Sequence, residues 1–174
     1  MTEELVLHPD TDGKTHYNIY TKARTRLGRI ATNLNDSPLV HPLYGPFRCL
    51  ESLWYYLRSG KVDERLRVMS GYEVKNVGKT LPKVFNNNFQ REFKLGILCK
   101  VRDNQELMDL LKASDPALPF VHYYYYGKDS NNLVIRRPNG HEWQMEFWEE
   151  IRRELIAKGQ VDDMYNDLLS TFHQ

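Results

Sequence analysis

Apolar residues fall at helical spacing in the stretch GPFRCLESLWYYLRSGK, which begins at residue 45 of this 174-residue chain. Leu50, Leu53, Trp54 and Leu57 occupy positions i, i+3, i+4 and i+7 of that stretch. This spacing is the apolar stripe of a helix that faces a core. The pattern therefore predicts a helix over residues 48–59 that ends close to a glycine.

The same reasoning extends to the rest of the chain. Helices are expected over 62–70, 71–78, 88–101, 104–114, 141–159 and 161–172, and strand-like runs over 16–20, 118–127 and 131–140. A turn-bounded segment is expected over 27–34, and the prolines of 35–46 predict an irregular loop. The predicted fold class is mainly α with a small β-sheet (α+β), in one compact domain spanning 1–174.

Composition and charge exclude several classes of protein. The net charge of +1 gives no global electrostatic reason for a nucleic-acid or membrane partner, although a local basic patch remains open. No apolar run approaches the roughly 20 residues of a membrane span, and the N-terminus lacks the pattern of a secretory signal. We therefore expect a cytoplasmic protein.

The two cysteines and six histidines do not have the spacing of metal ligands. Cys49 and Cys99 lie in apolar helical patterns, which is typical of buried free thiols in a reducing compartment. The histidines are scattered along the chain, and no C-x-x-C motif occurs. We expect neither a metal site nor a cofactor.

Three side chains that carry chemistry lie beside the apolar stripe of the 48–59 helix. Glu51, Tyr55 and Arg58 fall at i, i+4 and i+7 on its flank. A carboxyl group next to a tryptophan is desolvated, which raises its pKa and suits it to acid or base chemistry. The alternative is a Glu51–Arg58 pair that only stabilises the helix.

The run of four tyrosines at 123–126 would send two rings to each face of a strand. Outward rings beside a cleft can stack on a nucleobase, whereas sheet packing is the simpler alternative.

Lys100 falls on the apolar face of the 88–101 helix. We expect its side chain to snorkel to water. The alternative is a buried amine with a depressed pKa, the state that a nucleophilic lysine needs.

The segment GYEVKNVGK places Lys75, Gly78 and Lys79 close together. Glycine beside lysine can hold phosphate, although the spacing of a P-loop is missing.

These motifs together resemble the NADAR family of N-glycosidases, whose YbiA-like fold is then expected here. The family's Ser/Thr-Asn step resembles Thr32-Asn33, and its glutamate-bearing helix resembles CLESLWYYLRSGK, with Glu51 on the family's glutamate. FKLGILCKVRDNQELMDLLKAS is similar to the later aliphatic helices, with Lys100 on the family's lysine. LPFVHYYYYG and FWEEIRREL resemble the closing segments, so the resemblance spans residues 18–155 in order.

Family members cleave C1′–N bonds of ribose, either in riboflavin-pathway pyrimidines or in ADP-ribose attached to guanine. Such cleavage builds positive charge at the anomeric carbon, which a carboxylate stabilises, and the resemblance assigns that role to Glu51. It implies that Asn33 holds ribose hydroxyls, that Arg58 or Lys79 meets phosphate, and that aromatic residues stack on the base. The implied substrate-binding set is Arg29, Thr32, Asn33, Trp54, Tyr55, Arg58, Lys79, Phe85, Tyr125 and Tyr126.

The chain departs from the family pattern at three positions. Arg58 stands where the family has a lysine proposed to form a Schiff base, and arginine cannot form that adduct. Lys61 or Lys100 then replaces it as a catalytic amine, or water attacks directly. Phe85 stands in place of a tryptophan, and Tyr123 in place of an aspartate. These changes indicate an altered substrate and leave an inactive binding relative open.

The resemblance implies an ADP-ribose–guanine N-glycosidase that acts without a cofactor on DNA, RNA or nucleotides. Such a protein would reverse the action of an ADP-ribosylating toxin, in a cell or encoded by a virus. Three alternatives remain open: an N-glycosidase of riboflavin-type metabolites, a non-catalytic module that binds ADP-ribose or nucleic acid, and an interaction protein that docks a partner on an apolar face of 141–155.

Overall fold

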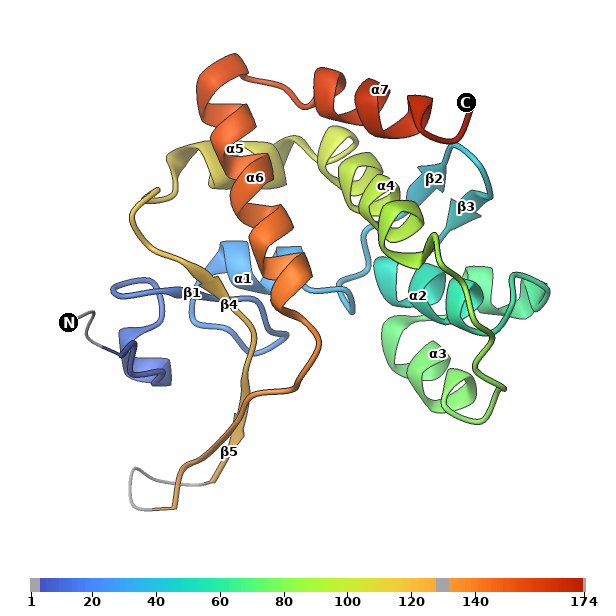
Figure 1. Cartoon of the computed structure of the whole chain (residues 1–174). Helices are drawn as coiled ribbons and strands as arrows, with labels where there is room; N and C mark the ends of the chain where they lie inside the picture. Colours follow the sequence, from blue (N-terminus) through green and yellow to red (C-terminus); the bar gives the residue numbers. More distant parts are fainter. Residues whose placement is uncertain (1–3, 128–131, 174) are drawn as a thin grey trace.

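Helices and short strands alternate along the chain in a computed structural model that describes residues 4–127 and 132–173 (Figure 1). The α-helices are α1 (Arg26–Ala31), α2 (Leu50–Arg58), α3 (Gly71–Gly78), α4 (Phe89–Arg102), α5 (Gln105–Ala113), α6 (Glu142–Lys158) and α7 (Asp162–Ser170). Two 3-10 turns are added, η1 (Pro9–Thr11) and η2 (Glu64–Val68). About half of the chain is helical, which confirms a mainly α, α+β-like class.

The strands form three separate two-stranded sheets within the described residues. β1 (Tyr17–Asn18) pairs in parallel with β4 (Phe120–Val121). β2 (Leu39–His41) and β3 (Gly45–Phe47) form an antiparallel hairpin, as do β5 (Tyr124–Tyr126) and β6 (Val134–Arg136). The prediction of one small sheet is therefore wrong in its arrangement.

Three local predictions also need correction. Residues 27–34 contain most of α1, whose N-cap Thr25 accepts a hydrogen bond from the backbone N–H of Gly28. The irregular segment 35–46 holds β2 and most of its hairpin. Residues 62–70 form the 3-10 turn η2 rather than an α-helix. The first residue of the predicted 131–140 segment lies outside the described residues.

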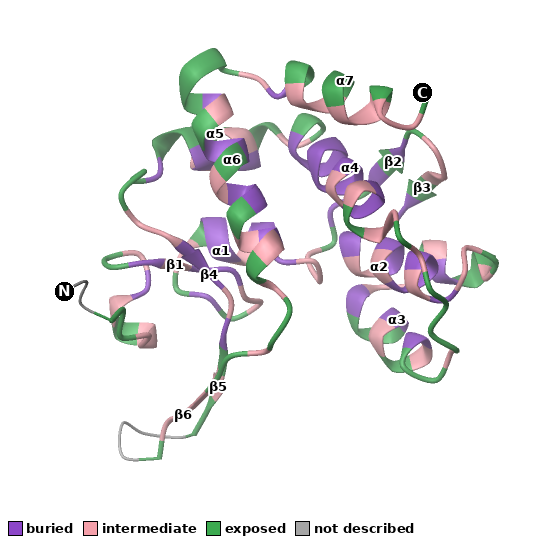
Figure 2. Cartoon of the chain, viewed as in Figure 1, coloured by how far each residue is buried: buried purple, intermediate pink, exposed green. Residues whose placement is uncertain are grey.

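Helix α2 forms the centre of one half of the core, as its apolar stripe predicts. Leu50, Leu53 and Leu57 are completely buried, whereas Trp54 at the edge of the stripe is half-buried. Figure 2 shows α2 coloured mostly as buried and intermediate. Each fully buried leucine contributes about 1.5–3 kcal/mol relative to an exposed one. This burial fixes the rotation of α2 and directs its flank, with Glu51, out of the core.

The C-terminus of α2 ends as the sequence predicts, at a glycine. Gly60 has a φ of +99° and Lys61 a φ of +63°. The Lys61 N–H donates to the Tyr56 carbonyl at 2.9 Å, and the Gly60 N–H donates to the Leu57 carbonyl at 3.4 Å. This pattern is a Schellman motif, which turns the chain sharply after the last helical turn.

The parallel pairing of β1 with β4 joins segments about 100 residues apart. Asn18 is completely buried, and its side chain bonds the backbone N–H and C=O of Tyr123 at 3.0 Å each. These two hydrogen bonds fix the chain just beyond β4, including His122. Helix α6 packs against β4, and Figure 1 shows α2 and α3 on the other side of the molecule, with α4 between the two parts.

Candidate functional site

Glu51 lies in the first turn of α2, and its side chain is half-buried. Its backbone N–H donates to the Asn33 carbonyl at 2.9 Å, but its carboxyl group makes no hydrogen bond or ion pair with any residue in the described ranges. Burial raises the pKa of Glu51 to about 7, and the charges of Lys75 and Lys79 partly oppose that rise. A carboxyl group in this state exchanges a proton readily at neutral pH.

The two lysines are held near Glu51 by the close approach of α3 to α2. Gly78 allows this approach, because a Cβ at that position would lie 2.3 Å from the Tyr55 ring. Lys75 is half-buried and Lys79 is exposed. Within the described residues neither lysine forms an ion pair, so both charges are available to an anionic ligand.

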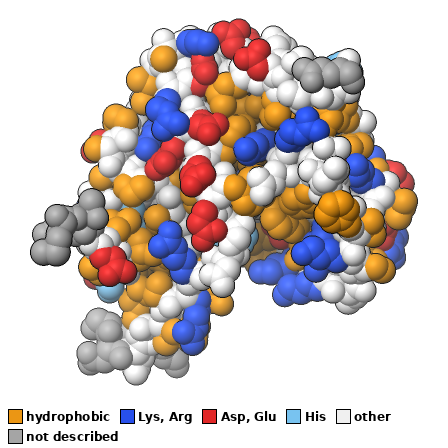
Figure 3. Space-filling model, in the orientation of Figure 1, with side chains coloured by type: hydrophobic (Ala, Val, Ile, Leu, Met, Phe, Trp, Pro, Cys, Tyr) orange, Lys and Arg blue, Asp and Glu red, His pale blue; other side chains and the backbone are white. Residues whose placement is uncertain are grey.

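A hollow separates α2 and α3 from the part of the molecule that carries β4, β5 and the start of α6 (Figure 3). Lys and Arg side chains lie along its edge on the α2–α3 side. Trp54 of α2 and His141, the N-cap residue of α6, stack across the two parts, with ring centroids 6.3 Å apart and planes 22° apart. Lys75 acts electrostatically on both Glu51 and His122.

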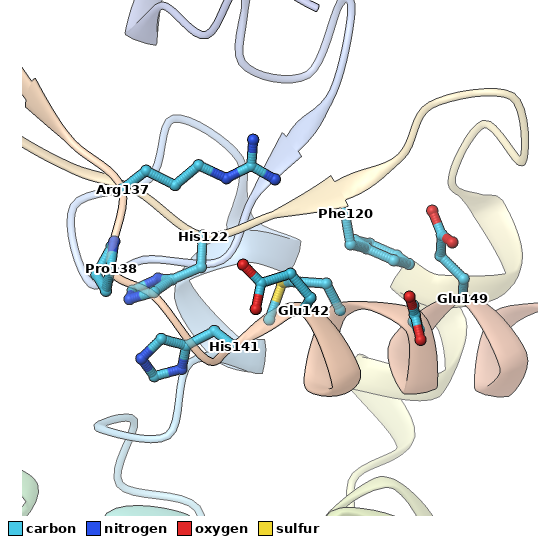
Figure 4. Close-up of a pocket in the computed structure, with 9 residues that line it drawn as sticks. Phe120, His122, Arg137, Pro138, His141, Glu142 and Glu149 are labelled. Carbon is cyan, nitrogen blue, oxygen red and sulfur yellow. The ribbon is translucent and has the colours of Figure 1, made fainter.

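A chain of side-chain amides connects the Asn33 region to the histidines. The Asn33 amide donates to Gln144 Oε1 at 3.3 Å, and Gln144 Nε2 contacts His141 Nδ1 at 3.4 Å. His122 Nδ1 lies 2.7 Å from the Ile19 carbonyl, to which it must donate because a carbonyl only accepts. The two imidazole rings meet edge to face at 4.9 Å (Figure 4).

Next to Trp54 a groove of about 560 Å³ opens beside α2 and the start of α4. Arg58 and Phe85 both line it, and Phe85 is 90% exposed. Arg58 Nη1 donates to the Gly78 carbonyl at 3.4 Å and its guanidinium lies 5.6 Å from the Tyr55 ring. Trp143, Phe89, Lys83, Val84, Asn86, Asn87, Gln90 and Arg91 complete the lining.

Lys61 is held away from Glu51 by a different carboxylate. Its Nζ donates to Glu92 Oε1 at 3.1 Å and to the Tyr44 hydroxyl at 3.0 Å. Tyr44 and Asn86 also donate to the Glu92 carboxylate, which is 1% exposed. Lys61 therefore belongs to a structural ion-pair network.

Lys100 is buried, so the prediction that it snorkels to water is wrong. Its side chain is 1% exposed, and its Nζ donates to the Thr32 carbonyl at 2.9 Å. Complete desolvation lowers its pKa to about 7. In this position the amine supports the backbone at Thr32. The carbonyl of the next residue, Asn33, accepts the hydrogen bond from the Glu51 N–H.

The remaining candidates occupy supporting positions. Arg29 Nη1 donates to the carbonyls of Ala23 and Arg24 at 2.9 Å each, which secures the loop before α1. Tyr55 is 8% exposed and lies in the core, with its ring against α3, so it offers no open face to a base.

The tyrosine run alternates as a strand pattern predicts. Tyr123 is completely buried, whereas Tyr124 and Tyr126 are 40% and 51% exposed. Tyr125 is half-buried, and its hydroxyl donates to the Lys22 carbonyl at 3.0 Å. Tyr126 therefore offers an accessible ring, whereas the Tyr125 hydroxyl is already bonded.

Sequence reasoning did not select Lys75, His122, His141 or Gln144 as site residues. Lys75 was visible only as part of a weak phosphate-type segment, and the histidines lacked ligand spacing. His122 and His141 meet because α6 packs against β4, and Trp54 of α2 then stacks on His141; no local pattern encodes these contacts. No cluster of three or more metal-ligating side chains occurs in residues 4–127 or 132–173.

Comparison with protein families, with curated proteins and with solved structures finds no match for this chain. Among the described helices, none has the length and apolar character needed to cross a membrane.

Proposed function

We propose that this protein is an N-glycosidase that hydrolyses the bond between a ribose C1′ and the nitrogen of a guanine base, releasing ADP-ribose. The observation that carries the proposal is Glu51, a half-buried carboxyl group with a pKa of about 7 and no partner among the described side chains, on which the cations Lys75 and Lys79 act electrostatically. The proposal includes the YbiA-like fold that the sequence motifs resemble.

The reaction needs a carboxylate where Glu51 stands. As the C1′–N bond breaks, its electron pair stays on the nitrogen and positive charge develops at C1′. The Glu51 carboxylate stabilises that charge and accepts a proton from the attacking water, whose oxygen bonds to C1′. The nitrogen gains a proton from solvent, so the products are ADP-ribose and the unmodified base.

Direct attack by water fits this chain better than a lysine adduct. Arg58 stays protonated, and Lys61 is engaged by Glu92 and Tyr44. Lys100 is 1% exposed, so a ribose does not reach its Nζ. Neither Lys61 nor Lys100 is therefore an accessible amine without a partner.

A substrate with a diphosphate fits the charges around the carboxyl group. Lys75 and Lys79 act on Glu51 electrostatically and have no carboxylate partner in the described part of the chain. Arg58, Lys83 and Arg91 add cations along the neighbouring groove, together with aromatic rings that stack on a base. This distribution favours ADP-ribose over a metabolite of the riboflavin type.

The test is incubation of the purified protein with an oligonucleotide that carries ADP-ribose on guanine, followed by mass spectrometry of both products. Wild-type protein should release ADP-ribose, and Glu51→Gln should lower the rate about 10²- to 10⁴-fold. Glu150→Gln is the matched control, because Glu150 is an exposed glutamate of α6.

Tight binding of the modified strand without release would instead identify a non-catalytic binding module. Absence of both binding and release would favour an N-glycosidase of riboflavin-type metabolites.

A further inference from the structure

A second cavity, of about 180 Å³, lies between the end of β4 and the first turns of α6. Its walls include Phe120, Met145 and Pro138, and its polar groups include His122 and His141 (Figure 4). Drug-sized ligands occupy pockets of about 300–1,000 Å³, so this cavity is sized for a fragment such as one heterocycle.

The hydrogen bonds of the two histidines fix which ring nitrogen carries the proton. His122 Nδ1 donates to the Ile19 carbonyl, which leaves Nε2 as an acceptor in the neutral ring. Gln144 Oε1 accepts from Asn33, so its Nε2 donates to His141 Nδ1, which leaves His141 Nε2–H as a donor. Burial lowers the pKa of both histidines, which favours these neutral forms at pH 7.

Both Nε2 atoms lack a hydrogen-bond partner within residues 4–127 and 132–173. The rings are 4.9 Å apart, and stacking on Trp54 holds the His141 ring in place. The lining of the cavity therefore includes one open acceptor, on His122, and one open donor, on His141. Adjacent donor and acceptor groups are what the edge of a nucleobase offers.

The charges around the cavity oppose a phosphate ligand. Glu142, Glu146 and Glu149 line it along one face of α6, against a single cation, Arg137. Lys75 of α3 and Lys79 at its C-cap, the lysines suited to phosphate, are not among the residues that line this cavity. An uncharged heterocycle with apolar faces fits the lining better than an anion does.

We propose that this cavity binds the guanine base from which ADP-ribose is removed, with His122 Nε2 accepting from the base N1–H and His141 Nε2–H donating to O6. This inference rests on the proposed function for its choice of guanine, and it makes the histidines specificity-determining residues. The assignment accounts for two open imidazole nitrogens that the hydrolysis step does not use.

The test measures binding rather than turnover, with guanosine 5′-monophosphate as the probe. Titration followed by NMR of the imidazole C–H signals should shift both histidines. His122→Ala and His141→Ala should each weaken the affinity about tenfold, whereas His173→Ala, at an exposed histidine, should leave it unchanged.

A change in the ligand tests the same contact without a variant that disturbs folding. The 1-methyl derivative of guanosine 5′-monophosphate lacks the N1 donor, so wild-type protein should bind it about tenfold more weakly. Ribose 5-phosphate should bind equally to wild type and to both histidine variants. Equal affinity for the methylated and unmethylated nucleotides would overturn the inference, as would histidine variants that bind like wild type.

Failure of this inference is distinguishable from failure of the proposed function. Loss of release in Glu51→Gln with unchanged nucleotide binding in the histidine variants retains the N-glycosidase and rejects the base pocket. Histidine-dependent nucleotide binding without release of ADP-ribose retains the base pocket and rejects the enzyme.

Discussion

Two glutamates of the central helices have opposite surroundings. Glu92 of α4 is buried and receives hydrogen bonds from Lys61, Tyr44 and Asn86. Glu51 of α2 is half-buried and receives none from the described residues. Burial alone does not distinguish a structural from a reactive carboxyl group; the supply of donors does.

The two surroundings also differ in how their lysines are used. Lys61 forms an ion pair with Glu92, whereas Lys75 and Lys79 act on Glu51 electrostatically without pairing to it. A paired lysine stabilises the fold, and an unpaired one remains available to a ligand. The region around Glu92 therefore serves stability, and the region around Glu51 retains capacity for chemistry.

The largest expected change in stability comes from Glu92→Gln. The substitution removes the charge that pairs with Lys61 and replaces one acceptor oxygen with an NH2 donor that faces other donors, and breaking such a buried pair costs several kcal/mol. We expect a loss of about 2 to 3 kcal/mol in the free energy of unfolding, at the low side of that range because the Lys61 side chain is 31% exposed. Urea denaturation measures it. Glu51→Gln in parallel should instead stabilise the protein at pH 7, because the raised pKa of Glu51 means that its ionisation opposes folding. An equal loss in both variants would remove the distinction.

Lys100→Met should change how stability depends on pH. The folded-state pKa of Lys100 is about 7, below its unfolded value, so between pH 7 and 10 the unfolded chain binds more protons. Wild type should therefore gain stability relative to Lys100→Met as the pH rises from 6.5 to 8.5, by at most about 1.4 kcal/mol per pH unit. Thermal unfolding across that range provides the measurement, with Lys112→Met on exposed α5 as control. If the stabilities of wild type and Lys100→Met changed with pH in parallel, the Lys100 amine would not be desolvated.

The pH dependence of hydrolysis should follow Glu51. Its pKa is raised to about 7, so the carboxylate is lost as the pH falls through 7. The rate should fall about tenfold per pH unit on that limb and level off above it. Single-turnover rates from pH 5 to 9 provide the measurement. An acidic limb near pH 4.5 would mean that Glu51 is solvated during the reaction.

The smallest expected effect comes from Lys75→Ala and Lys79→Ala. Both lysines lower the pKa of Glu51, so removing either should move the acidic limb upward by a few tenths of a pH unit. The KM for the diphosphate-bearing substrate should also rise, about tenfold for the double variant. Lys112→Ala should alter neither quantity. A change in kcat alone would assign the lysines to the chemical step instead.

Local patterns predicted the central helices well, because α2 buries a stripe that the sequence carries at helical spacing and α4 is apolar over most of its length. They failed for β2 and β3, since the prolines at 38, 42 and 46 suggested a loop. Edge strands of a two-stranded hairpin tolerate proline, because half of their backbone groups need no partner strand.

The candidate site divides in the same way. The positions of Glu51 and Trp54 one turn apart on α2 were predictable from helical spacing. The meeting of His122 with His141 depends on the parallel β1–β4 pair and on α6, which lie far apart in the sequence. The burial of Lys100 depends on the loop at Thr32, whose carbonyl accepts from the amine. Periodicity within the helix does not show this loop, and it therefore predicted that the side chain reaches water.

The missing side chain at Gly78 has a consequence for the acidity of the site. The distance between α2 and α3 is set by contact of this glycine with the Tyr55 ring. A methyl group there would push the helices apart and carry Lys75 and Lys79 away from Glu51. The pKa of Glu51 is therefore adjustable through the spacing of α2 and α3.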